Sequence, residues 1–272
     1  MGSQRETSIQ NRLSFCTQRK IVLRTFLLPL TLALFMGCSE WPPETMRPPV
    51  ALPPSLVDID PWISKLLDSN VDSAKQLLDG RLATHTEGLE PLIRRMNEFV
   101  PCQVSFSSGI GHVRCLRRYK DSKSGKYNYD VLYIAQPLPS RALGSRLNYF
   151  DEAIRPLAEA FLQRFAGSGE EMEGMAGQFT FRNWPAASDF TSRDASSFGD
   201  WRDARLFYAA MNGDSVFIKP DGSTAWHVLE TDTMIAVAPT LEQFIVNYAD
   251  FRESHDVFDS WAYRAFIKDR TK

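Results

Sequence analysis

An uncharged run of 13 residues, from Thr25 to Gly37, ends directly before Cys38 and separates two regions of the chain. The run is too short to cross a bilayer comfortably, since a spanning helix needs roughly 20 apolar residues. Basic residues precede the run, and a small residue, Gly37, closes it, which is typical of a secretory signal. We therefore expect cleavage before Cys38 and a folded part that lies entirely after it.

The cysteine that follows this cleavage point resembles the lipid-bearing cysteine of bacterial lipoprotein signals. The resemblance implies that residues 1–37 are a signal peptide and that lipid, such as palmitate, is attached to Cys38. It also implies a place in the bacterial cell envelope, facing the periplasm or on the outer membrane, for which Ser39 is a further hint. Ordinary cleavage near Gly37 and an uncleaved anchor are the alternatives.

A proline-rich stretch follows the predicted lipid site. Six prolines fall between Trp41 and Pro54. Because proline fixes φ and favours extended polyproline II, such a stretch acts as a semi-rigid spacer. We interpret residues 38–57 as a tether that holds a domain away from the membrane, an interpretation that is compatible with a disordered tail.

The charge of the chain excludes two classes of partner. The full chain has a formal net charge of -2. The first 37 residues carry five basic residues and one acidic residue, so the remainder has 26 basic and 32 acidic side chains, or about -6. Nucleic acid requires clustered positive charge, and so does a basic membrane-binding face. We expect no nucleic-acid partner, and membrane attachment through the lipid anchor.

The two cysteines of the expected folded part, Cys102 and Cys115, lie in strand-like segments on either side of Ser108-Gly109. A tight turn at that dipeptide pairs residues whose numbers sum to 217, and the two cysteines satisfy this sum. They would face each other in a non-hydrogen-bonded pair, whose Cα separation of roughly 4.5 Å suits a disulfide. We predict a structural disulfide between them, with two buried free thiols as the alternative.

Hydrophobic periodicity indicates an α+β fold, in which helices pack on an antiparallel sheet. Asp60-Pro61 begins a predicted helix, since Asp caps well and proline suits the first turn. Residues 167–176 are acidic and glycine-rich and are interpreted as a flexible loop. The other main segments are predicted helices at 89–99 and 154–165, and predicted strands at 103–106, 111–117 and 127–134.

The best-patterned region runs from Asp214 to Phe251. Strands alternate with a Pro220-Asp221-Gly222-Ser223 turn, and a Thr240-Leu241-Glu242-Gln243 capping box opens a helix. With the helix that precedes it, this pattern resembles the SUKH superfamily, which includes Smi/Knr-type cell-wall regulators and many bacterial immunity proteins. The resemblance covers about residues 150–252 and implies a binding fold without catalytic residues. We expect a SUKH-like α+β domain at 141–272, and at 58–140 either a separate α+β subdomain or an elaboration of the same sheet.

No residue pattern indicates catalysis or metal binding. The four histidines, His85, His112, His227 and His255, lack metal-ligand spacing, and no G-x-S-x-G nucleophile motif occurs. We therefore predict no catalytic residues, no metal and no cofactor. Aromatic residues dominate recognition surfaces, which makes Trp184, Trp201 and Trp226 candidate partner-binding residues, although large aromatics also fill cores.

These observations favour one function over two alternatives. The favoured hypothesis is an exported, membrane-tethered lipoprotein that carries a non-enzymatic protein-binding module, with an unknown protein as its partner. One alternative is a cell-envelope hydrolase whose site is assembled from scattered residues. The other is a structural envelope lipoprotein without a specific ligand.

Overall fold

The computed structural model describes residues 60–83, 87–107, 110–120, 125–172, 175–179, 184–190, 195–210, 213–254 and 260–270. All of them belong to one compact unit, Glu40–Lys272. The predicted signal, Cys38 and the proline-rich tether lie outside the described residues. Among the helices that are described, none is long and apolar enough to span a membrane.

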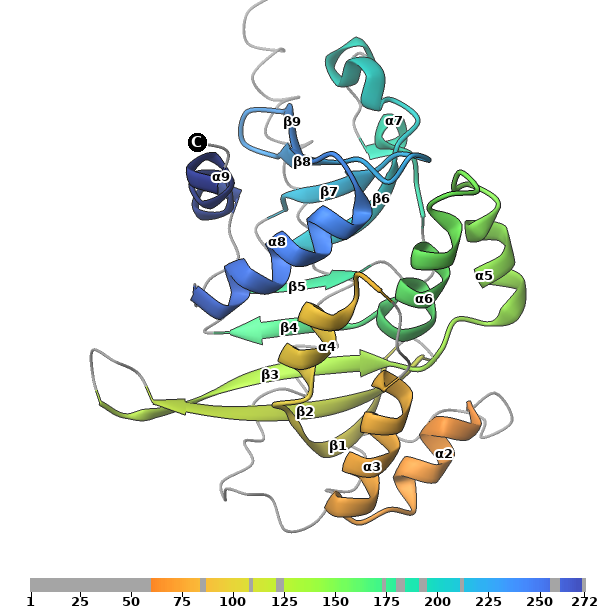
Figure 1. Ribbon diagram of the computed structural model, residues 1–272, viewed down its shortest axis with the longest axis vertical. Coiled ribbons are helices and arrows are strands. Elements are labelled where there is room, and N and C mark those ends of the chain that lie inside the picture. Colours follow the sequence, from red (N-terminus) through yellow and green to blue (C-terminus); the bar gives the residue numbers. More distant parts are fainter. Residues whose placement is uncertain are drawn as a thin grey trace, which may run out of the picture. The chain divides into compact units, whose positions relative to one another are not determined.

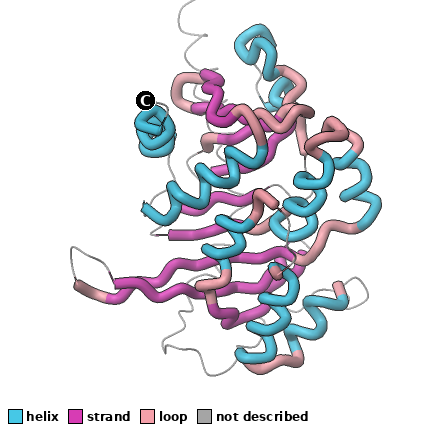
Figure 2. Tube along the Cα trace, viewed as in Figure 1, coloured by secondary structure: helices cyan, strands magenta, loops and turns pink. Residues whose placement is uncertain are grey.

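A single antiparallel sheet forms the frame of the unit (Figures 1 and 2). Within the described residues its nine strands follow one another in space in the same order as along the chain. The strands are β1 (Val100–Ser107), β2 (Ile110–Lys120), β3 (Tyr127–Ala135), β4 (Gly169–Met172), β5 (Met175–Phe179), β6 (Arg205–Ala210), β7 (Ser215–Ile218), β8 (Thr224–Val228) and β9 (Thr233–Ala238).

Helices cover one face of this sheet and complete the predicted α+β fold, which the structure confirms (Figure 1). The helices α4 and α8 contact each other over the sheet, α3 contacts β1, and α6 contacts β3. The helices are α2 (Pro61–Leu67), α3 (Val71–Leu82), α4 (Glu90–Met96), α5 (Ser140–Leu147), α6 (Arg155–Phe165), α7 (Ala187–Phe190), the 3-10 segment η2 (Ala195–Trp201), α8 (Leu241–Ser254) and α9 (Ser260–Arg270).

The main core lies between the helices and the sheet and is rich in aromatic side chains. Phe161 of α6 packs against Phe179 and Phe207, with ring centroids 4.9 Å and 5.0 Å away. All three are at most 3% exposed. Each fully buried side chain of this kind contributes roughly 1.5–3 kcal/mol of hydrophobic stabilisation, which holds the helix layer on the strands.

A second, smaller core covers the other face of β6 to β8. Phe198 of η2 packs with Leu206 and Phe217, and all three are buried. Because both faces are covered here, Trp226 and His227 are both buried, at 0% and 2% exposure. Neither of these two neighbours along β8 therefore faces solvent.

Local sequence signals begin the helices as predicted. The Asp60 carboxylate accepts a hydrogen bond of 2.8 Å from the Trp62 backbone N–H at the start of α2. The Thr240 hydroxyl accepts one of 3.1 Å from the Gln243 backbone N–H at the start of α8. In the predicted turn, Gly222 has a φ of +82°, a value that glycine adopts without strain.

The predicted acidic loop at 167–176 is instead part of a β-hairpin. β4 and β5 pair from Gly169↔Gln178 to Met172↔Met175. β4 also pairs with β3 through Val131↔Glu171, so the hairpin is held in the sheet by its neighbour. The strand character comes from this pairing, because the acidic, glycine-rich composition alone favours a loop.

The same β3–β4 pairing joins the two halves of the chain. β3 belongs to the segment 58–140 and β4 to the segment 141–272. The halves therefore share one sheet.

The predicted hairpin register holds over most of β1 and β2 and then shifts at a β-bulge. Gln103 faces Arg114 as predicted, but Pro101 faces Cys115, so Cys102 is the extra residue of the bulge. The two cysteines do not form a disulfide, and both are fully buried. The structure thus corrects the predicted disulfide: the inserted residue removes the direct opposition on which the disulfide depended.

Candidate functional site

β2 and β3 continue beyond the strands on either side of them. β1 pairs with β2 only as far as Val100↔Leu116, and β4 pairs with β3 only from Val131 to Tyr133. The pairs from Arg117↔Asp130 to Lys120↔Tyr127 therefore form a two-stranded ribbon, beside which no other described strand pairs. We call residues 117–120 and 127–130 the arm, which extends past the ends of β1 and β4 in Figure 1.

One face of the arm exposes two tyrosines of β3, each directly opposite a cation of β2. Residues directly opposite each other share a face, which places Arg118 with Tyr129 and Lys120 with Tyr127. All four side chains are exposed, and Tyr127 and Tyr129 are 56% and 36% exposed. The Arg118 guanidinium lies 3.6 Å from the centroid of the Tyr127 ring, a cation–π contact that orders both groups. We call this the aromatic-basic face.

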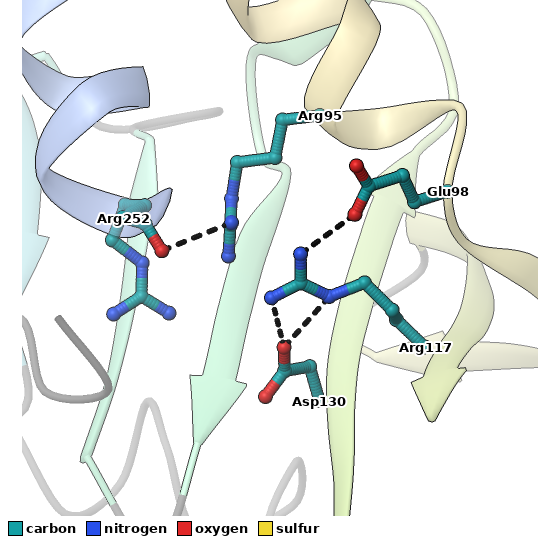
Figure 3. A network of polar contacts seen from close by, with 5 residues as sticks. All are labelled: Arg95, Glu98, Arg117, Asp130 and Arg252. Carbon is teal, nitrogen blue, oxygen red and sulfur yellow. Dashed lines mark hydrogen bonds and ion pairs between the residues drawn. The ribbon is translucent and has the colours of Figure 1, made fainter. Parts of the chain in front are cut away.

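The opposite face of the arm carries an ion-pair network at its base, built on the buried Asp130 (Figure 3). Arg117 Nε donates a hydrogen bond of 2.9 Å to Asp130 Oδ2, and Arg117 Nη1 donates one of 2.7 Å to Glu98 Oε2. The Asp130 side chain is only 1% exposed, whereas Glu98 is 54% exposed. The network ties the arm to the turn after α4, which carries Glu98.

The electrostatics of this network keep Arg117 charged. Burial by itself disfavours the guanidinium cation, but the hydrogen bonds and negative charges of Glu98 and Asp130 outweigh it, so the pKa of Arg117 is raised above its ordinary value. The positive charge of Arg117 is therefore neutralised within the protein, in contrast to the exposed charges of Arg118 and Lys120.

A second buried arginine links α4 to α8 next to this network (Figure 3). Arg95 Nη1 donates a hydrogen bond of 3.0 Å to the carbonyl oxygen of Arg252, in the last turns of α8. Arg95 is 1% exposed. α4, which lies beside the base of the arm, is thus fixed to another helix of the core and provides a rigid support.

The three candidate tryptophans lie in separate environments. Trp226 is fully buried, packs 5.4 Å from the ring of Tyr263 in α9, and so cannot contact a partner, which corrects its assignment. Trp184 is half-buried against Tyr149, at 5.0 Å. Trp201 is half-buried with the Lys219 ammonium 4.3 Å from its ring centroid. The last two pack against the domain rather than project from it.

The strongest geometric candidate for catalysis is buried. His227 Nε2 lies 2.8 Å from Asp232 Oδ1, and Ser215 stands directly opposite His227 in the sheet. Asp232 has a φ of +54°, an uncommon left-handed conformation for a residue other than glycine. Ser215 and His227 are each 2% exposed, so a substrate cannot reach them, and we interpret the pair as a tie across the β8–β9 turn.

No metal site emerges from the part of the chain that the structure describes, and its hollow against α2 and α3 is open. No group of three or more His, Cys, Asp or Glu side chains there is arranged to hold a metal ion. An open hollow of about 490 Å³ lies against α2 and α3 and is lined by Lys65, Asp68, Ser69, Ser73, Gln76 and Leu77. Its lining holds one cationic and one anionic side chain, Lys65 and Asp68, and no histidine.

The sequence predicts a strand at 127–134 but did not identify its Tyr127 and Tyr129 as site residues. The available signal was an alternation of tyrosines in one strand with cations at matching positions of the preceding strand. Whether these tyrosines and cations are covered depends on which strands lie next to them. The local sequence pattern does not contain this information.

Comparisons with known proteins found no matching family model, no matching curated protein and no matching solved structure.

Proposed function

We propose that this protein is an exported, membrane-tethered lipoprotein whose folded domain is a non-enzymatic protein-binding module, and that the arm contacts the partner. The observation that carries the proposal is the exposure of Tyr127 and Tyr129 side by side on the arm. Among the described residues, the large apolar side chains with comparable exposure are these two and Leu229. Tyrosine and arginine are enriched among the residues that dominate protein–protein binding energy.

The construction of the arm suits recognition. The cation–π contact of Arg118 with Tyr127 orders the exposed face, and the Arg117–Asp130 pair holds the base. A surface that is ordered before binding loses less conformational entropy when the partner docks. Rigid aromatic side chains on an ordered ribbon can therefore contribute most of their burial energy to affinity.

The tether completes the proposal. The signal-like run before Cys38 and the six prolines after it support a lipid-anchored domain held away from the membrane. The resemblance of about residues 150–252 to the SUKH superfamily, a binding fold, supports binding over catalysis. We include in the proposal that this segment is related to the SUKH superfamily.

Site-specific photo-cross-linking in cells tests the proposal. A photoreactive amino acid placed at Tyr129 should yield a discrete protein adduct. The same amino acid placed at Ser145, an exposed position on α5, should not. In the Cys38→Ser variant the adduct should be lost or much reduced, because the domain no longer resides at the membrane. Equal yields from both positions, or no adduct from either, would overturn the binding-module proposal.

A further inference from the structure

The arm concentrates positive charge on a protein that is otherwise acidic. The eight residues of the arm contain three basic side chains, Arg117, Arg118 and Lys120, and one acidic side chain, Asp130. The predicted mature chain, in contrast, carries about six net negative charges. The charge of the arm is therefore opposite in sign to the net charge of the predicted mature chain.

Within the described residues, two of these cations, Arg118 and Lys120, lie on the aromatic-basic face without a carboxylate partner. The ion pairs within the described residues include Arg117 but neither Arg118 nor Lys120. Arg118 is instead stacked on Tyr127, which leaves the edge of its guanidinium available to a hydrogen-bond acceptor. The face thus offers two unneutralised cations and two tyrosine rings within one short ribbon.

We propose that the partner segment that docks on the arm is acidic: an Asp- or Glu-rich stretch of another protein. This inference rests on the proposed function and names the chemistry of its partner. Carboxylates of the segment pair with Arg118 and Lys120, with the planar guanidinium able to bind a carboxylate through two hydrogen bonds. The apolar parts of the segment pack on the rings of Tyr127 and Tyr129.

The charge distribution favours a short acidic segment over a membrane or a nucleic acid. Electrostatic attraction is screened over about 10 Å in ordinary salt, so a short segment on the arm experiences mainly the local cations. An anionic bilayer or a nucleic acid presents extended negative charge, which also meets the acidic remainder of the chain and is repelled by it. The proposal therefore commits to a protein segment.

The binding test uses the full protein reconstituted in phosphatidylcholine vesicles, with fluorescein-labelled octaglutamate as the probe and anisotropy at low salt as the readout. The double variant Arg118→Gln/Lys120→Gln should weaken binding roughly tenfold, because each cation contributes a fraction of a kcal/mol to about 1 kcal/mol. The matched control Lys65→Gln/Arg141→Gln removes the same charge from exposed positions on α2 and α5 and should bind like the unaltered protein. Equal weakening in both variants would overturn the inference, since it would show attraction by net charge alone.

Two further probes and one sedimentation measurement test whether the arm instead binds a membrane, a nucleic acid or a second copy of the chain. Fluorescent vesicles of one part phosphatidylglycerol to three parts phosphatidylcholine report a membrane, and labelled oligothymidine reports a nucleic acid. Sedimentation of the protein alone reports a second copy. The inference would be overturned if either probe bound more tightly than octaglutamate and lost this binding in Arg118→Gln/Lys120→Gln. It would also be overturned if the protein dimerised and the same variant did not.

The cellular cross-link separates this inference from the proposed function. Loss of the Tyr129 adduct in Arg118→Gln/Lys120→Gln, with retention in the matched control, supports the acidic partner. If the adduct persists in the arm variant, the binding module stands and the acidic segment is excluded. If the unaltered protein gives no adduct, the proposed function itself fails.

Discussion

Arg117 of β2 stands directly opposite Asp130 of β3, and its Nε donates a hydrogen bond of 2.9 Å to the buried Asp130 Oδ2. This pair lies where the sheet narrows to two strands, one residue beyond the last pairing of β1 with β2. The pair lies on the face of the arm that is turned toward α4. The aromatic-basic face, on the other side, exposes Tyr127 and Tyr129. The base of the arm is therefore a buried ionic contact, and its exposed surface is aromatic and basic.

Removing the charge of Asp130 should destabilise the fold more than removing that of Glu98. Asp130→Asn leaves Arg117 partly buried with a single carboxylate, and we expect a loss of about 2–4 kcal/mol in the free energy of unfolding. Glu98→Gln should cost at most about 1 kcal/mol, because Glu98 is 54% exposed. Urea denaturation measures both. Similar losses for the two variants would show that burial of the pair does not govern its contribution.

Acid should destabilise the protein through His112. Its pKa is lowered from 6.5 to about 4, chiefly because burial disfavours the charged ring. Between these values the unfolded chain takes up a proton at His112 and the folded chain does not, so stability present above pH 6.5 is lost as the pH falls toward 4. The full shift corresponds to about 3 kcal/mol.

The test compares how much the free energy of unfolding changes with pH in the unaltered protein and in a variant without His112. The absolute stability of the variant is not the quantity compared. In His112→Gln the free energy of unfolding should differ less between the two ends of the window, by up to about 3 kcal/mol. Urea denaturation at both ends gives this difference for each protein. An unchanged difference in the variant would place the acid sensitivity on other groups.

Gly177 of β5 should not tolerate a side chain. A Cβ atom there would lie 2.1 Å from Cζ of Tyr208, which is 1% exposed and cannot move away freely. Gly177→Ala should lower the free energy of unfolding by at least about 3 kcal/mol. The matched substitution Gly144→Ala, in α5 with no atom within 4 Å of the new Cβ, should stabilise by up to about 1 kcal/mol. Thermal unfolding of the two variants compares them, and a stable Gly177→Ala protein would refute the close approach.

Cys102 and Cys115 should behave as buried thiols and not as a disulfide. Both are fully buried, and burial raises the pKa of the Cys115 thiol far above its ordinary value, so little thiolate forms. Iodoacetamide should label neither cysteine in the folded protein and both in denaturant without reductant. Mass spectrometry of the two peptides provides the measurement. Labelling in denaturant only after reduction would restore the disulfide predicted from the sequence.

Much of the secondary structure could be predicted because its signals are local. Asp60 and Thr240 cap their helices through hydrogen bonds to backbone groups two and three residues away. The Ser107↔Ile110 to Gln103↔Arg114 register follows from a turn and from alternation. The prediction failed where one residue changes the geometry, as at the Cys102 bulge, and where a neighbouring strand imposes structure on a weak sequence, as at β4.

The sequence by itself determined the α+β class, the capped helices and the one-sided placement of Tyr127 and Tyr129, because these depend on contacts within a few residues. Only the tertiary structure decided which surfaces are accessible. Coverage by η2 and α9 buries His227 and Trp226, and the early end of β1 and β4 leaves the arm exposed. Accessibility is set by segments far apart in the chain, and for that reason the candidate site became visible in the fold and not in the sequence pattern.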